Sequence, residues 1–181
     1  MSVMIGTPLD IAPYIRGVQL VLIGYSGYTK ESRYETDKMV RQEIIRTATR
    51  VRNHMENILE RQYISGNLEM SRITKLCIEE CDYLIEDVSK SSSGMQHAFL
   101  SGQRSSSKRD LKELIKHDHD VICMITKAVN LSNSAEISSP IDTERTLELI
   151  IQTNRMITSC RGYFSARKNV LAGLKQKKVR R

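Results

Sequence analysis

The run His117-Asp118-His119-Asp120 is the densest group of potentially reactive side chains in the sequence. Imidazole and carboxylate groups transfer protons and bind metals near neutral pH. In a helix, His117 and Asp120 would share a face, and Cys77 and Cys81 from another segment would complete a four-ligand zinc site. However, Cys-x-x-x-Cys spacing is weakly specific, and no second Cys or His pair has zinc-finger spacing. We therefore favour small core residues for Cys77 and Cys81, because buried free cysteine behaves as a hydrophobe.

Asp118 stands where the surrounding apolar pattern, at Ile115 and Ile122, requires a buried residue. An unpaired carboxylate in a core costs several kcal/mol, so we expect Asp118 to be protonated, paired or coordinating. Asn154 occupies a comparable position in the last helical segment. The pattern therefore predicts buried polar residues at Asp118 and Asn154, with a possible polar layer that joins helices and fixes their register.

A second candidate for chemistry is an acidic strip in one predicted helix, which comprises Glu79, Glu80, Asp82, Glu86 and Asp87. Paired carboxylates on a helix face bind magnesium in all-α hydrolases, provided that a facing helix supplies more of them. The candidates for these facing carboxylates are Glu56 and Glu60, but the sequence alone does not show where they lie relative to the acidic strip. We favour a solvated face, and the chain also lacks a phosphate-binding glycine loop, a nucleophile elbow and a metalloprotease helix. No catalytic residue and no cofactor are therefore assigned.

The net charge of +7 is concentrated at the end of the chain. A basic tail, residues 175–181, contains Lys175, Lys177, Lys178, Arg180 and Arg181. It would attract a nucleic acid, an anionic membrane surface or an acidic protein, and it would do so in a salt-dependent way. Arg46 and Arg50 add basic groups that could meet the same anionic partner. Acidic residues interrupt the helix arginines, so nucleic-acid binding is an alternative rather than the leading interpretation.

The elements that would position these residues are helices. Aromatic content is only 5%, and three prolines occur in 181 residues, which suits long helices and not a β-sandwich. Apolar residues recur at spacings of three and four over about 32–64, 67–88, 107–133 and 139–174, with a short helix over about 10–24. Residues 89–107 are rich in Ser and Gly and are predicted to be a linker. The sequence predicts one all-α domain, 1–181, built as an elongated bundle of about four long helices with a short N-terminal helix.

Three residues set the expected helix boundaries. Ser32 with Glu35 has the pattern of a capping box, and Asn67 after Ser65-Gly66 has the pattern of an N-cap.

The first and the last of the long helices are expected to be the longest. Their ends would protrude and offer apolar faces to a partner or a second copy.

The location of the protein follows from what the chain lacks. There is no secretory signal pattern and no transmembrane segment, and the four cysteines do not have the spacing of a disulfide scaffold. We expect reduced thiols and an intracellular, cytoplasmic protein.

Together these features predict a non-enzymatic helical binding or scaffold protein. It would act through helix–helix contacts with a protein partner or as a homo-oligomer, for which a coiled coil is one arrangement, and its basic tail would hold an anionic partner. The alternatives are a nucleic-acid-binding bundle and an all-α metal-dependent enzyme.

Overall fold

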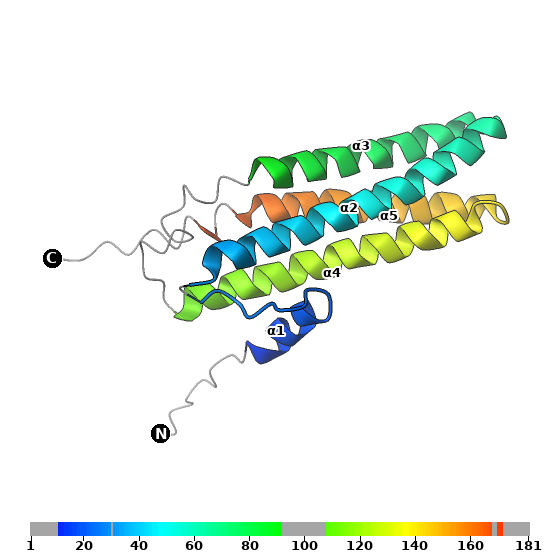
Figure 1. The fold of residues 1–181 in the computed structure, drawn as a ribbon. Coiled ribbons are helices and arrows are strands. Elements are labelled where there is room, and N and C mark those ends of the chain that lie inside the picture. The colour runs from blue at the N-terminus through cyan, green and yellow to red at the C-terminus, as the bar shows by residue number, and fades with distance from the viewer. Residues whose placement is uncertain (1–10, 30, 92–107, 168–169, 172–181) are drawn as a thin grey trace, which may run out of the picture.

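Five helices make up the computed structural model, which describes residues 11–29, 31–91, 108–167 and 170–171 (Figure 1). They are α1 (Ala12–Gln19), α2 (Arg33–Ile64), α3 (Leu68–Lys90), α4 (Lys108–Ser138) and α5 (Thr143–Ser165). No strand occurs in these ranges. The prediction of an all-α bundle with four long helices and a short N-terminal one is confirmed.

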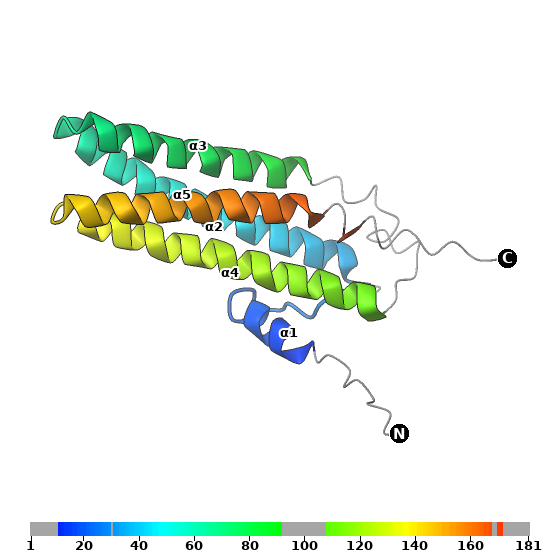
Figure 2. The same ribbon diagram turned by 180° about the vertical axis from the view of Figure 1, so that it is seen from behind.

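The four long helices form an up-down-up-down bundle (Figures 1 and 2). Consecutive helices run antiparallel, and α2 packs on α3 and α4 while α5 packs on α3 and α4. The short helix α1 lies outside the bundle, against α4. We call the end with the α2–α3 and α4–α5 turns (residues 63–68 and 137–142) the tip. The opposite end, where α3 and α5 end and α2 and α4 begin, is the open end.

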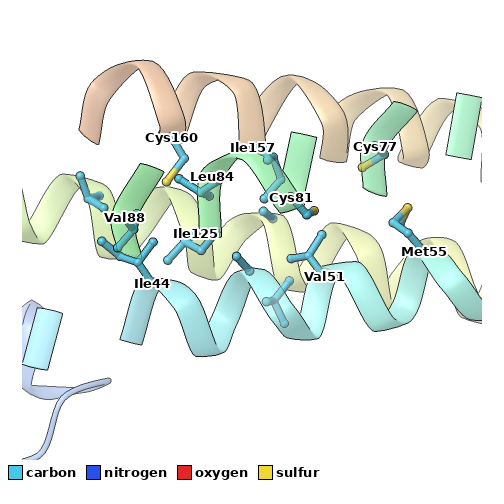
Figure 3. Close-up of a cluster of buried hydrophobic side chains, with 14 of the residues drawn as sticks. Ile44, Val51, Met55, Cys77, Cys81, Leu84, Val88, Ile125, Ile157 and Cys160 are labelled. Carbon is cyan, nitrogen blue, oxygen red and sulfur yellow. The ribbon is translucent and has the colours of Figure 1, made fainter. Parts of the chain in front are cut away.

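The core follows the apolar stripes read from the sequence. Figure 3 shows Ile44, Val51 and Met55 of α2 opposite side chains of the other three long helices. The remaining labelled residues are Cys77, Cys81, Leu84 and Val88 of α3, Ile125 of α4, and Ile157 and Cys160 of α5. Each of these side chains is fully buried. The cysteines of α3 therefore serve as core residues, as the sequence favoured.

Short polar signals set the turns at the tip. Asn67 Oδ1 accepts a hydrogen bond from the backbone N–H of Met70 at 3.1 Å, which confirms the predicted cap of α3. Gly66 precedes it with φ of +74°, a conformation that favours glycine. Asp142 caps α5 in the same way through the N–H of Arg145, at 2.9 Å.

The predicted capping box at Ser32 is wrong. Ser32 is the residue before α2, but its side chain makes no capping bond. Its hydroxyl instead lies 2.7 Å from that of Thr29 in the preceding loop. A local side-chain hydrogen bond thus replaces the bond to the helix backbone.

Two helix lengths also differ from expectation. α4 continues to Ser138, and the polar residues Ser132 and Ser134 are accommodated inside it because their hydroxyls donate to carbonyls of the preceding turn. α5 ends at Ser165, well before residue 174. α2, the first long helix, is the longest as expected, with 32 residues, but the next longest is α4, with 31, and not the last helix, which has 23. Residues 92–107 of the predicted linker and the whole basic tail lie outside the described residues.

Candidate functional site

Asp118 of α4 lies fully buried at the centre of a polar network near the open end. Its Oδ2 accepts hydrogen bonds from the hydroxyls of Tyr25 and Tyr28, at 2.9 and 2.6 Å. Its Oδ1 forms an ion pair with Arg167, which follows α5 and is buried as well. Burial, reinforced by the negative charge of Asp118, raises the pKa of Tyr25, and burial raises that of Tyr28. Both phenols therefore remain protonated donors.

Arg167 extends the network to α2. Its Nη2 lies 2.8 Å from Oδ1 of Asp37 and donates to the Tyr28 hydroxyl at 2.6 Å. The other oxygen of Asp37 accepts from Nε of Arg41 at 2.8 Å. Charges thus alternate from Arg41 through Asp37 and Arg167 to Asp118. The network links α2, α4, the segment before α2 and the segment after α5, and it cross-links these parts of the chain in the interior.

Asn154 does not join this network. It is half-buried on α5, and its Oδ1 has no hydrogen-bond partner in the described part of the chain. Tyr163 of α5 does contact this part of α4, because its backbone carbonyl accepts a hydrogen bond from His117 Nε2 at 3.0 Å. Asn154 lies nine residues earlier, about 14 Å away along the helix axis. The structure therefore does not bring Asp118 and Asn154 into one polar layer.

His117 is held in its neutral form. Its ring stacks on Tyr163 with centroids 4.7 Å apart, and only 4% of the residue is exposed. Burial and the neighbouring charge of Arg167 lower its pKa. Because Nε2 donates to a carbonyl, Nδ1 is the unprotonated nitrogen, and it has no hydrogen-bond partner among the described residues.

His119 and Asp120 form a separate, partly exposed cluster beneath α1. His119 Nδ1 lies 3.1 Å from Asp120, whose other oxygen accepts from the Tyr163 hydroxyl at 3.1 Å. Cys123 Sγ lies 3.6 Å from His119 Nε2. Across the described ranges, no three side chains of His, Cys, Asp or Glu are placed to hold a metal ion.

The zinc set considered from the sequence is not assembled. Cys77 and Cys81 lie in the core, whereas Asp120 lies among its α4 and α5 neighbours near α1. A hydrogen bond with Cys77 and burial raise the pKa of Cys81, which opposes the thiolate form that zinc needs. All four cysteines are free.

The acidic strip of α3 is engaged in ion pairs. Arg52 of α2 bridges Asp82 and Glu56, with 2.7 Å to each. A guanidinium thus occupies the position between facing carboxylates that a magnesium ion would need. Arg161 of α5 pairs with Asp87 at 2.6 Å and with Glu80 at 3.7 Å, and Glu86 pairs with Lys90. This arrangement is that of a charged outer face.

The described residues are electrically balanced. They contain 20 of the 28 Lys and Arg residues and 20 of the 21 Asp and Glu residues. Arg46 pairs with Glu43 at 2.6 Å, and Arg50 is exposed. The net charge of +7 therefore resides in the remaining residues, five of whose cations belong to the basic tail.

The feature that sequence reasoning missed is the apolar surface of the tip. Five large side chains there are between 63% and 83% exposed: Tyr63, Ile64, Leu68, Ile137 and Ile141. Gln62 Nε2 donates to the Ser139 hydroxyl at 3.2 Å and joins the two turns. The signal was available, because apolar residues flank both polar turns directly in the sequence.

Comparisons with models of protein families, with curated proteins and with solved structures give no match for this chain. Among the described helices, none is long and apolar enough to cross a membrane.

Proposed function

We propose that this protein is a non-enzymatic helical scaffold that makes protein–protein contacts, associates with itself and holds an anionic partner through its basic tail. The observation that carries the proposal is the apolar tip. Side chains of that size and exposure are costly to leave in water, and here they stand on two turns that a hydrogen bond joins, as is typical of an interaction site.

The charge distribution supports the second part of the proposal. The described residues have no net charge to hold a polyanion, because their 20 Lys and Arg side chains are balanced by 20 Asp and Glu side chains. The five cations of residues 175–181 have no acidic neighbour in sequence. An anionic partner, nucleic acid included, would therefore bind chiefly through the tail and in a salt-dependent way.

Both alternatives are less well supported. A nucleic-acid-binding bundle needs a continuous positive surface, whereas Arg46, Arg52 and Arg161 each pair with carboxylates. A metal-dependent enzyme needs ligands that converge on one point. The ligands of the zinc set lie on different parts of the bundle, and in the acidic strip the guanidinium of Arg52 lies where a magnesium ion would sit.

The test is the solution mass of the full chain, measured by light scattering after size exclusion across a salt series, with absorbance at 260 and 280 nm. We expect an oligomer that persists at high salt. We also expect a fluorescent single-stranded oligonucleotide to bind at low salt and dissociate as salt rises. Replacing the five tail cations with Gln should abolish this binding, whereas Arg46→Gln with Arg50→Gln should weaken it little. A salt-independent monomer that binds no polyanion would contradict the proposal.

A further inference from the structure

The tip has the size of a protein interface. At the observed exposures its five large side chains offer on the order of 600 Å² of apolar surface, the upper end of what a monomer ordinarily leaves exposed. A standard interface buries about 800 Å² on each partner. The tip and the polar residues around it thus provide enough area for one stable contact.

The polar rim of the tip shows which kind of partner fits. Its exposed carboxylates are Glu60, Glu69, Asp142 and Glu144, and its exposed guanidiniums are Arg61, Arg72 and Arg145. An apolar centre with a rim of both charges is typical of protein interfaces. Carboxylates are in slight excess, which disfavours an anionic membrane surface, because a lipid headgroup layer would repel them.

A rim with both charges is also complementary to itself. When two identical surfaces meet about a twofold axis, residue i of one copy contacts residue j of the other and j contacts i, so opposite charges that lie away from the axis can pair. The two turns of the tip carry comparable apolar side chains, with Ile64 on one and Ile141 on the other. A twofold contact can place the α2–α3 turn of one copy on the α4–α5 turn of the next.

From the exposed area and the mixed rim, we infer that the tip is the self-association surface, at which two copies of this chain meet end to end. The inference rests on the self-association in the proposed function and specifies where it occurs. It excludes side-by-side packing of the long helices as the main contact. Such a dimer would be about twice as long as one bundle, or roughly 100 Å, because α2 alone spans about 48 Å.

The test compares matched Ile→Glu substitutions in the full chain. Ile64→Glu and Ile141→Glu each place a charge in the tip. Ile23→Glu is the control, because Ile23 is 95% exposed and follows α1, which packs near His119, about 30 Å along α4 from the tip. Sedimentation equilibrium gives the dissociation constant, and small-angle scattering gives the longest dimension of the dimer. Circular dichroism establishes that each variant is folded.

We expect each tip variant to weaken dimerisation at least tenfold, the control to change it less than threefold, and the wild-type dimer to be elongated. A dimer that both tip variants leave intact would overturn the inference and leave self-association standing. A compact dimer of about the length of one bundle would do the same. A wild-type monomer at all concentrations would overturn self-association itself.

Discussion

Arg167, two residues beyond the end of α5, forms an ion pair with Asp118 of α4 in the interior of the protein. Neither side chain is exposed by more than 4%. Ions so deeply buried are tolerated only when their remaining polar atoms also have partners. Tyr25, Tyr28 and Asp37 supply partners for Asp118 and for Nη2 of Arg167, whereas Nε of Arg167 is buried without a partner in the described part of the chain. The pair therefore holds the segment before α2 and the segment after α5 against the open end of the bundle.

Arg167→Met should be strongly destabilising. It leaves Asp118 and Asp37 buried without their shared cation, a loss that costs about 3–5 kcal/mol in comparable sites. Arg161→Met is the matched control, because Arg161 forms its ion pairs on the surface, where such pairs contribute about 0–1 kcal/mol. Urea unfolding of both variants measures the difference. Equal losses would show that the buried network does not stabilise the fold.

Stability should fall on mild acidification because of His117. Burial lowers its pKa below the unfolded value of 6.5, so the unfolded chain binds more protons between the two pKa values. The contribution of neutral His117 is complete above pH 6.5 and is lost as pH falls through the folded pKa.

His117→Gln isolates this effect, because Gln retains an N–H donor for the Tyr163 carbonyl but does not titrate. Its free energy of unfolding should vary less than that of the wild type between pH 7 and 5. Glu136 does not interfere in this range. Burial raises its pKa, but hydrogen bonds from His54 and Asn57 outweigh burial and hold the pKa below 4.5, so the stability that Glu136 contributes is lost only in more acidic solution. Identical pH profiles for variant and wild type would rule out the role of His117.

Two glycines in helices should respond oppositely to alanine. A Cβ at Gly17 of α1 would lie 2.7 Å from Cδ2 of His119, so the ring or α1 must move. We expect Gly17→Ala to cost about 1–3 kcal/mol. A Cβ at Gly162 of α5 meets nothing within 4 Å, and Gly162→Ala should stabilise by about 0.4–1 kcal/mol. Thermal unfolding measures both, and His119→Ala should relieve the cost of Gly17→Ala if the clash is its cause.

One thiol of four should react in the folded protein. Cys123 is exposed, whereas Cys77, Cys81 and Cys160 are buried. Burial also raises the pKa of Cys160 to about 12, which leaves almost no thiolate at neutral pH. A chromogenic disulfide reagent should titrate one group in native buffer and four in denaturant. The fast group should disappear in Cys123→Ser; rapid reaction of two or more groups would mean that the core opens readily.

The sequence predicted best where a single helix carried the information. α2 was predicted to its last turn because its apolar stripe is long and Gly66 interrupts it sharply. The Ser32 cap failed because Thr29, a residue in the preceding loop, bonds the same hydroxyl. The polar run around Ser132 was read as a helix end, although serines can bond the preceding turn without breaking a helix.

The polar network shows where such reasoning stops. Asp118 was recognisable as a buried carboxylate from its own helix, but its partners Tyr28 and Arg167 are 90 and 49 residues away. Their proximity depends on how the helices pack. In the sequence, Arg167 lies shortly before the basic tail, so nothing distinguished it as a buried residue. The tip was missed for a related reason, because only the packed bundle brings its two turns together.

The charge balance of the described residues bears on how the protein would approach the polyanion that we propose as its partner. A body without net charge experiences little long-range force, whereas the cations after Leu171 are attracted from a distance of the order of 10 Å at physiological salt. Leu171 packs with Leu114 and Ile115 near the start of α4. An electric field would therefore turn the molecule so that its open end leads, and the tip would face away from the polyanion at the moment of encounter.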